Sequence, residues 1–445
     1  MSHDDSPVQT PRSHHRQAVG DSSDTHALAN VTAIDATINV STAASIHWDV
    51  VVIGAGPAGS MAATLMARRG LRTLLVERRT FPRYKVCGAC LNPLSLSLLD
   101  AVGLGHVVAD AVSLDRFCLQ SRGGTLQLEL PGSVSLSREQ LDARLAQAAI
   151  DAGAAFLSEC SAKVLPLENA NGMGVIPTPL REVELKTGTD DRQAVHTAVV
   201  IAADGLTHGC VSRLPEFSSH VVTTSRLGAG TVVEEFPAFF EPGCIYMSSA
   251  RGGYVGLVRL EDGRLNVAAA LDASALDTSA DDQSGGLGPA AGRVMQSAGF
   301  PEVPALHDVE WFGTPSLTRS TRPLASRRVF LVGDAAGYVE PFTGEGIAWA
   351  LSSAASVVPL VQLACDRWDS MLERVWHDEW QRNVGRHQGW CRGLARLLRH
   401  PTAVSTLTRV VAACPWLAQP VLSRLNRTPR RSASRNDAPT VRKAG

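Results

Sequence analysis

The sequence carries almost no net charge, and that absence limits what the protein can bind. Its 42 Lys and Arg residues are balanced by 43 Asp and Glu residues, which leaves a formal net charge of −1. A chain without a cationic excess has no general electrostatic attraction to nucleic acid. We therefore predict no nucleic-acid partner.

The N-terminus lacks the apolar core of a secretory signal, because it begins MSHDDSPVQTPRSHHRQ. The nine cysteines are scattered and odd in number, which does not suit a disulfide framework. Both absences predict a cytoplasmic protein with free thiols. Residues 1–46 are polar and aperiodic, which predicts a disordered tail. Its His14-His15 pair is expected to be solvated, and no metal site is predicted.

A clear transmembrane run is also missing. The longest uncharged run, Gly346 to Cys365, approaches the ~20 residues that span a bilayer. It contains three serines and Pro359, however, so it predicts a buried helix kinked near that proline.

The chain does contain a nucleotide-binding pattern, between Trp48 and Glu77. An apolar, β-branched run at Asp49–Ile53 predicts a buried parallel strand. A small-residue helix follows, and then a second apolar strand at Thr73–Val76, which ends at Glu77. Between the first strand and the helix, three glycines stand at G-x-G-x-x-G spacing: Gly54, Gly56 and Gly59.

Each residue type in this unit suits a dinucleotide. Gly54 permits the tight turn, Gly56 lets a pyrophosphate approach the backbone, and Gly59 allows the helix and strand to pack closely. The helix N-terminus offers N–H groups and a partial positive charge to phosphates. Glu77 is placed to accept hydrogen bonds from a ribose diol. Two later turns after apolar strands, Asp204-Gly205 and Gly333-Asp334, point to the same cofactor.

Five motifs carry a resemblance to a known family: GAGPAGS, FPRYKVCG, SREQLDARL, AADG and VGDAAGYVEPFTGEGI. The chain resembles the flavoprotein superfamily of p-hydroxybenzoate hydroxylase, most closely its geranylgeranyl-reductase-like branch, over Trp48 to Leu351. The resemblance implies an α/β fold, in which a Rossmann-like, three-layer FAD-binding domain with a parallel sheet carries an inserted β-rich substrate layer and C-terminal helices. We expect the FAD-binding domain at 47–205 and 311–365 and the substrate domain at 206–310. C-terminal helices are expected at 366–427 and a disordered basic tail at 428–445.

The resemblance assigns FAD-binding roles along the chain. The residues expected along the pyrophosphate, ribose and ribityl groups are Gly54, Gly56, Pro57, Ala58, Gly59, Glu77, Arg138, Asp204, Gly205 and Asp334. Those expected along the rest of the cofactor are Arg83, Lys85 and Val164, the last through its backbone at adenine. Those expected near the flavin ring are Cys87, Gly88, Pro341, Gly344, Gly346 and Ile347. A helix that begins at Gly344–Gly346 would also favour a reduced, anionic flavin, because its N–H groups and positive dipole lie at the electron-rich edge.

No side chain stands out as a general acid or base, so the catalytic residues are unknown. The flavin performs the hard step in such enzymes. The resemblance implies an FAD-dependent oxidoreductase acting on a hydrophobic small molecule that is isoprenoid, quinone-like or polyketide-like. We predict a monooxygenase or a related reductase first, and a prenyl double-bond reductase second. A non-catalytic flavoprotein that binds a lipid or passes electrons is the alternative from another class.

Three further questions stay open from the sequence. NAD(P)H has no domain of its own, so it is expected to bind transiently unless another donor supplies electrons. Cys87-x-x-Cys90 is either a redox pair or, more simply, two packed thiols. The segment Gln381 to Gly445 holds thirteen Lys and Arg residues and one acid. It suits peripheral contact with an anionic membrane, although helices packed on the body with solvated arginines are the expectation we favour.

Overall fold

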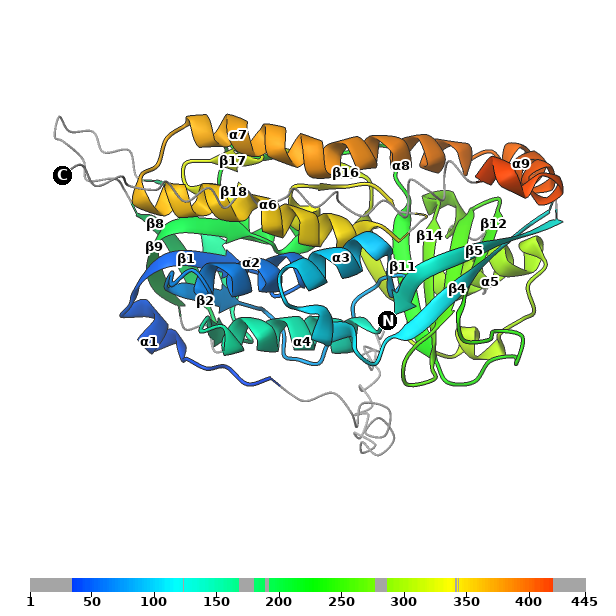
Figure 1. The fold of residues 1–445 in the computed structure, drawn as a ribbon, viewed down its shortest axis with the longest axis horizontal. Helices are drawn as coiled ribbons and strands as arrows, with labels where there is room; N and C mark the ends of the chain where they lie inside the picture. The colour runs from blue at the N-terminus through cyan, green and yellow to red at the C-terminus, as the bar shows by residue number, and fades with distance from the viewer. Residues whose placement is uncertain are drawn as a thin grey trace, which may run out of the picture.

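Two sheets lie next to each other along the long axis of the molecule, and helices cover the first of them (Figure 1). This arrangement comes from a computed structural model, which describes residues 34–122, 124–167, 180–188, 192–276, 286–340, 342 and 344–418. The mixed architecture confirms the α/β fold class with a Rossmann-like sheet, a β-rich substrate layer and C-terminal helices.

The first sheet, here called the nucleotide sheet, forms around strand β1. Its strands are β1 (His47–Ile53), β2 (Thr73–Val76), β6 (Ala155–Leu157), β7 (Ser161–Val164), β8 (Arg181–Lys186), β9 (Arg192–Ala202), β17 (Ala325–Ser326) and β18 (Val329–Leu331). The order is β17-β18-β9-β1-β2-β6, and the neighbours from β18 to β6 are parallel. Strands β7 and β8 extend it antiparallel from the first half of β9. Val50, Val51 and Val52 are fully buried, as a parallel strand covered on both faces requires.

Helices pack side by side against the nucleotide sheet (Figure 1). They are α2 (Pro57–Ala67), α4 (Arg138–Asp151) and α6 (Gly346–Asp366), with α3 (Pro93–Ala101) and α7 (Met371–Trp380) beside α6. Within the described ranges, α6 is the one helix long and apolar enough to cross a membrane. Most of its apolar window is buried inside the protein and it contains Pro359, so the predicted buried helix is confirmed.

The second sheet, here called the substrate sheet, has the order β15-β11-β14-β13-β12-β4-β5-β3. Its strands are β3 (Cys90–Leu91), β4 (Val112–Ser121), β5 (Gly124–Ser135), β11 (Leu227–Val233), β12 (Cys244–Ala250), β13 (Gly253–Arg259), β14 (Leu265–Leu271) and β15 (Phe312–Ser316). All its neighbours are antiparallel except β4 and β12. A short third sheet joins β10 (Ser218–Val221), β16 (Arg319–Arg322) and β19 (Gly337–Tyr338).

One helix packs on each face of the substrate sheet. Helix α5 (Leu287–Ala298) packs with the apolar cluster that includes Tyr246 and Val255. Helix α9 (Pro401–Ala413), which follows α8 (Arg386–Leu397), packs with the cluster that includes Met247 and Tyr254. Neighbouring residues fall on opposite faces because strand side chains alternate.

The predicted domain boundaries are wrong for the substrate sheet. The β4–β5 hairpin lies in the range predicted for the FAD-binding domain, whereas β4 pairs in parallel with β12 inside the substrate sheet. Strands β3 and β15 lie outside the predicted range 206–310 as well. Alternating apolar residues identify a strand but do not say which distant strand it pairs with.

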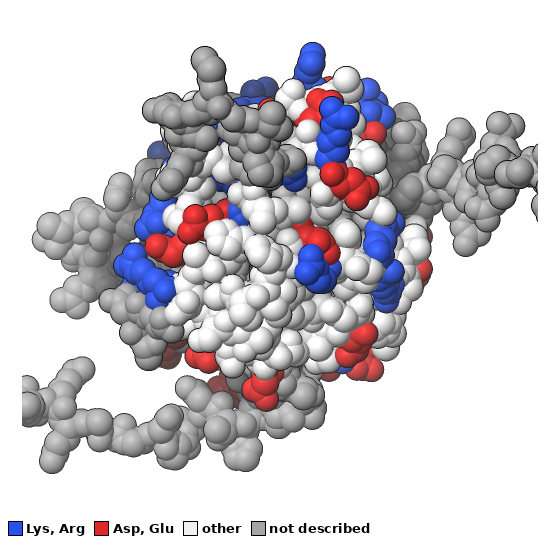
Figure 2. All heavy atoms as spheres, turned by 90° about the vertical axis from the view of Figure 1, so that its left-hand side faces the viewer, with Lys and Arg blue, Asp and Glu red and all other residues white. Residues whose placement is uncertain are grey.

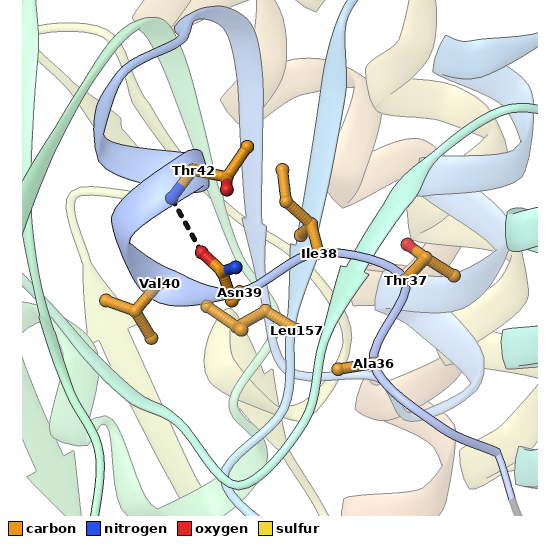
Figure 3. Close-up of a pocket in the computed structure, with 7 residues that line it drawn as sticks. All are labelled: Ala36, Thr37, Ile38, Asn39, Val40, Thr42 and Leu157. Atoms are coloured by element: carbon orange, nitrogen blue, oxygen red, sulfur yellow. Dashed lines mark hydrogen bonds between the residues drawn. The ribbon is translucent and has the colours of Figure 1, made fainter.

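The predicted disordered tail is also wrong over residues 34–46. Helix α1 (Val40–Ala44) buries Val40 and Ala43, and the Asn39 side chain accepts a hydrogen bond from Thr42 N–H at 2.8 Å (Figure 3). The Thr37 N–H donates to the Phe156 carbonyl, so the segment is tied to β6. A five-residue helix is too short to give a periodic signal. Residues 1–33 and the predicted basic tail at 428–445 lie outside the described residues.

Candidate cofactor site

The predicted cofactor segments meet at one edge of the nucleotide sheet. Ile53 pairs with Val76 of β2 and with Ala202 of β9, and Leu331 of β18 pairs with Ala202 in turn. Parallel strands therefore end together, and ligands of open α/β sheets bind outside such carboxyl ends. The residues that follow these strands are Gly54, Glu77, Asp204, Gly205, Gly333 and Asp334.

The first turn has the geometry that its glycines predict. Gly54 has φ +101°, and a Cβ there would lie 2.5 Å from the Ala203 carbonyl oxygen. A Cβ on Gly59 would lie 1.8 Å from the Gly54 oxygen, so α2 packs directly on the turn. At Gly56 a Cβ would meet nothing nearer than Arg138 Nη2 at 3.9 Å and Lys85 Nζ at 4.0 Å. Gly56 therefore faces open space bordered by two cations.

Helix α2 begins with Pro57, Ala58 and Gly59, and its N-cap Gly56 supplies no capping side chain. The unpaired N–H groups of its first turn thus remain for a ligand, as expected at an anion site. The turn at Gly333 (φ +58°) closes on this helix, since a Cβ there would lie 2.9 Å from Ala58 Cβ.

Lys85 brings positive charge to both glycine turns, and Arg138 brings it to the first. A Cβ on Gly205 would lie 3.5 Å from Lys85 Nζ, so the same ammonium group borders Gly56 and Gly205. Burial lowers the pKa of Lys85, and Arg138 lowers it further, while Asp334 opposes both. Burial also raises the pKa of Asp334, against Lys85 and Arg138. Because Lys85, Arg138 and Asp334 act on one another's charge, an anion bound beside them would also change the pKa of Lys85 and Asp334.

Asp142 holds the two arginines in place. Arg138 donates Nε and Nη2 to the two Asp142 oxygens at 2.8 and 2.7 Å, and Arg83 Nη1 lies 3.2 Å from Oδ2. Arg83 Nη2 reaches Glu77 Oε2 at 3.2 Å, and that oxygen also accepts from Ala55 N–H at 3.0 Å. We call these five residues the phosphate cluster: Glu77, Arg83, Lys85, Arg138 and Asp142. The sequence prediction missed Asp142, although the i,i+4 spacing from Arg138 was a usable signal.

Two other predicted residues lie around this cluster. Asp204 Oδ2 accepts from Cys210 N–H at 2.9 Å, and its buried Oδ1 has no partner among the described residues. Val164 is buried in β7, which packs on the short helix Gly209–Val211 after Asp204. No contact of the Val164 backbone tests its predicted role at adenine.

The predicted flavin-facing residues come from two separate loops. Gly344 (φ +72°) lies against the Cys90 side chain, because a Cβ on Gly344 would be 3.5 Å from Cys90 Cβ. Gly346 begins α6 and Ile347 is buried in its first turn. Gly88 is exposed, with nothing within 4 Å of the place where its Cβ would stand. Pro341 lies outside the described residues.

Cys87 and Cys90 are free thiols in this structure. The Cys90 thiol donates to the Gly88 carbonyl at 3.1 Å, and burial raises the pKa of Cys90. The Cys87 carbonyl accepts from Asn266 Nδ2 at 2.9 Å, which ties this loop to β14 of the substrate sheet. A buried thiol with a raised pKa is a poor nucleophile, which favours the simpler, packed interpretation of Cys90.

A second charged group is absent from the sequence prediction. It includes Glu340, in the segment before α6 that we call the flavin-facing loop. Arg226 and Glu340 are each 1% exposed, and Arg226 Nη1 lies 3.2 Å from Glu340 Oε1. Arg226 Nε also contacts Asp272 Oδ1 at 3.0 Å, and Arg399 Nη1 shares that oxygen at 3.4 Å. Glu340 Oε2 is buried and has no partner in the part of the chain that the structure describes. We call Arg226, Asp272, Glu340 and Arg399 the scaffold cluster.

An apolar cluster connects the flavin-facing loop with the C-terminal helices. The Phe342 ring lies 5.2 Å from that of Tyr254 and 6.2 Å from that of Phe117. The Arg226 guanidinium lies over the Tyr254 ring, 5.4 Å from its centroid. The same contiguous cluster continues through Leu119, Leu126, Met247, Leu398, Val404 and Val411. Its contacts run along one face of the substrate sheet to α9.

A surface depression near α1 stands apart from the predicted residues. Its volume is about 480 Å³, and its lining comes from Ala36–Val40, Thr42 and Leu157 (Figure 3). None of these side chains is charged and none belongs to the predicted site, so it plays no part in the cofactor argument.

The residues at the sheet edge fit an FAD. The open space at Gly56 faces two cations, which suits a diphosphate, and the first turns of α2 and α6 carry no side-chain cap. Residues 47–364 match the family described as FAD binding domain.

The chain belongs to the FAD-binding domain family.

This flavoprotein resembles curated reductases over most of its length. It is 28% identical over 392 residues to a menaquinone reductase of Mycobacterium tuberculosis, an alignment that covers 80% of this chain and 86% of that one. It is 28% identical over 354 residues to digeranylgeranylglycerophospholipid reductase 1 of Methanopyrus kandleri, covering 76% and 86%. The solved structure of a flavin-dependent brominase covers 86% of this chain and 94% of its own, with a TM-score of 0.68. At 14% identity that last likeness shows the fold alone.

These findings confirm the predicted family branch, the FAD cofactor and the enzyme class, an FAD-dependent oxidoreductase. The predicted roles of single residues toward FAD stay predictions, supported by their placement around the sheet edge.

Proposed function

We propose that this flavoprotein reduces a carbon–carbon double bond in the polyprenyl chain of a lipid or quinone. The observation that carries the proposal is the apolar cluster that begins at Phe342, beside the flavin-facing loop, and continues along the substrate sheet to α9. The cluster is buried between α9 and the sheet, so a long hydrocarbon chain that entered along it would meet apolar side chains and be kept from water, and burial of its apolar surface would supply the binding free energy.

The names of the relatives support the same substrate class. One is named for menaquinone and the other for digeranylgeranylglycerophospholipid. Both compounds carry polyprenyl chains, and both proteins are named as reductases, so we place reduction ahead of hydroxylation for this chain.

We propose that the phosphate cluster and the two turns hold FAD, which supplies hydride to the substrate when reduced. Lys85, Arg138 and the α2 N-terminus would bind its diphosphate, with Asp204 and Asp334 on the neighbouring turns. The residues at Gly344–Ile347 and Cys87-Gly88 would face its flavin ring. We propose NAD(P)H as the transient donor that reduces it, and a cytoplasmic location for the catalytic body.

Reduction of a double bond also requires a proton, which the chain itself can provide. Tyr254 belongs to the apolar cluster, and its ring lies 5.2 Å from that of Phe342. A tyrosine phenol is protonated at neutral pH, because its ordinary pKa is about 10. We propose that Tyr254 delivers this proton to the carbon that does not receive hydride, and that apolar neighbours such as Met247 keep water away from both.

The test uses purified holoenzyme, reduced with dithionite under anaerobic conditions and mixed with a polyprenyl quinone or a geranylgeranyl lipid. The expected product gains two mass units with no oxygen present. A product that gains sixteen mass units, formed only with O₂ and NADPH, would establish hydroxylation instead. Rapid flavin reduction with no turnover of any small molecule would support the electron-transfer alternative and remove the proposal.

A further inference from the structure

We propose that α9 and the turn after it, residues 401–418, dock the enzyme on an anionic lipid bilayer. The proposal rests on the function proposed above, because a polyprenyl lipid is held in a bilayer. The segment forms the end of the molecule beside the substrate sheet (Figure 1).

Helix α9 is apolar on two sides, whereas a helix that only covers a core is apolar on one. Val404, Thr408 and Val411 are buried against the substrate sheet. On the other side Leu407 is 46% exposed and Val410 is 45% exposed. Trp416 and Leu417 in the following turn are 69% and 39% exposed. Leu407 and Val410 are three residues apart on α9, so they share one side of the helix and form an outward apolar stripe.

The charge of the C-terminal segment complements anionic lipid. Residues 381–418 contain six arginines and no Asp or Glu: Arg382, Arg386, Arg392, Arg396, Arg399 and Arg409. Arg399 belongs to the scaffold cluster, and Arg382 pairs with Glu379 at 3.0 Å. Burial lowers the pKa of Arg392, and Arg322 and Arg396 lower it further, which shows that these cations gather closely. An exposed apolar stripe with nearby arginines and aromatic residues is the composition of helices that lie in a membrane interface.

The inner side of α9 gives the docking a purpose. Val404 and Val411 contact the apolar cluster that reaches Tyr254 and Phe342. A polyprenyl chain that leaves the bilayer at α9 would thus meet apolar side chains up to the flavin-facing loop, without crossing water.

The opposite end of the molecule offers a matched control. At the end that carries α1, acidic and basic side chains of both signs surround a broad uncharged area (Figure 2). Leu363, in the last turn of α6, is 56% exposed, and the charged residues that follow it, Asp366 and Arg367, are of opposite sign. It matches Leu407 in side chain and in exposure but lies far from α9.

The experiment is flotation of the intact holoenzyme with vesicles of phosphatidylcholine alone or with 30% phosphatidylglycerol, a fraction taken as roughly that of an anionic membrane. The wild type and Leu363→Asn should float with the anionic vesicles. Salt at 0.5 M should weaken flotation, because it shortens the Debye length below the ~8 Å of physiological ionic strength. The double variant Leu407→Asn/Val410→Asn should show at least about tenfold lower partitioning, since it removes the apolar contacts. Its FAD content and thermal unfolding should match those of Leu363→Asn.

Three outcomes would overturn the proposal. The wild type fails to float on anionic vesicles, or the double variant floats as well as the wild type. In the third, no form floats, and light scattering shows that the wild type is a dimer and the double variant is a monomer. That result would assign the stripe to contact with a second copy of the chain. Flotation does not depend on turnover. If the wild type floats as expected but reduces no polyprenyl lipid, the docking surface stands and the proposed function fails.

Discussion

The phosphate cluster and the scaffold cluster both pair arginines with carboxylates, yet the pKa of Asp142 in the first is lowered and the pKa of Glu340 in the second is raised. Burial alone would raise the pKa of Asp142, but Arg138 and Arg83 outweigh burial, and the pKa is lowered. Burial raises the pKa of Glu340 as well, and there Arg226 and Arg399 do not cancel it.

The number of guanidinium contacts explains the difference. Asp142 accepts two hydrogen bonds from Arg138 and lies 3.2 Å from Arg83. Glu340 has one oxygen at 3.2 Å from Arg226, which also serves Asp272. The first cluster therefore fixes ionised groups around the proposed phosphate site, whereas the second ties the substrate sheet, the segment before α6 and the C-terminal helices together.

Arg138→Met should have the largest effect on this contrast. It removes the two hydrogen bonds of Arg138 to the fully buried Asp142, and breaking a buried ion pair by removing one partner costs about 3–5 kcal/mol. We expect the free energy of unfolding to fall by that amount in urea titrations, and FAD to be lost on purification. The double variant Arg138→Met/Asp142→Leu should recover most of the stability without recovering FAD. A double variant no more stable than the single one would mean that Asp142 is not the source of the penalty.

Tyr254→Phe tests whether the scaffold cluster borders the chemistry. Loss of a positioned acid typically lowers turnover by 10²–10⁴-fold, so we expect about 100-fold lower kcat with KM unchanged. Tyr246→Phe is the control, because Tyr246 lies on the other face of the substrate sheet. Equal kcat for Tyr254→Phe and the wild type would exclude Tyr254 as the proton donor.

Lys85→Gln should weaken FAD binding by about tenfold near pH 6.5, since a hydrogen bond to a charged group is worth ~1.5–3 kcal/mol. The pKa of Lys85 is lowered without cofactor, first by burial and then by Arg138, and phosphate would favour the ammonium form. Binding then takes up a proton above that lowered pKa. FAD affinity, followed by flavin fluorescence, should fall as pH rises through it. The variant should show a flatter pH profile, and an identical slope would contradict the assignment.

Glu340→Gln should have the smallest effect at neutral pH, with a diagnostic pH dependence. Because folding raises the pKa of Glu340 above about 4.5, its stabilisation is present at low pH and is lost as pH rises through the folded value. Asp142→Asn should show the reverse. The lowered pKa of Asp142 stabilises above about 3.8, and that stabilisation is lost as pH falls through the folded value. Urea unfolding from about pH 2 to 8, relative to wild type, measures both. Slopes of equal sign would remove the contrast between the clusters.

Short-range patterns were enough to predict the nucleotide sheet and its turns. Gly59 is required by the close approach of its backbone to the Gly54 carbonyl within one βαβ unit, and the Ser137 hydroxyl accepts from Gln140 N–H at 3.2 Å at the start of α4. Asp142 could have been found from the helical spacing of the same motif. These features depend on neighbours close in sequence.

Long-range pairing was the part that the sequence could not predict. The β4–β5 hairpin belongs to the substrate sheet because Arg116 of β4 pairs with Cys244 of β12, and no local sequence pattern indicates that distant pairing. The scaffold cluster draws Arg226, Asp272, Glu340 and Arg399 from four segments that share no spacing. The outward stripe of α9 was likewise hidden, because sequence alone does not tell which side of an amphipathic helix packs inward.

The partnership of Arg226 with the last part of the chain also sets a time order for biosynthesis. Arg226 donates to the Leu398 carbonyl at 3.4 Å, and Asp272 is shared with Arg399. A ribosome that adds ~5–20 residues per second needs roughly 3–12 s to proceed from residue 340 to residue 399. During those seconds the emerging polypeptide already contains both sheets but lacks the residues that complete the junction between them. A premature stop codon shortly before residue 398 would therefore leave an arginine meant for the interior without its final carbonyl acceptor.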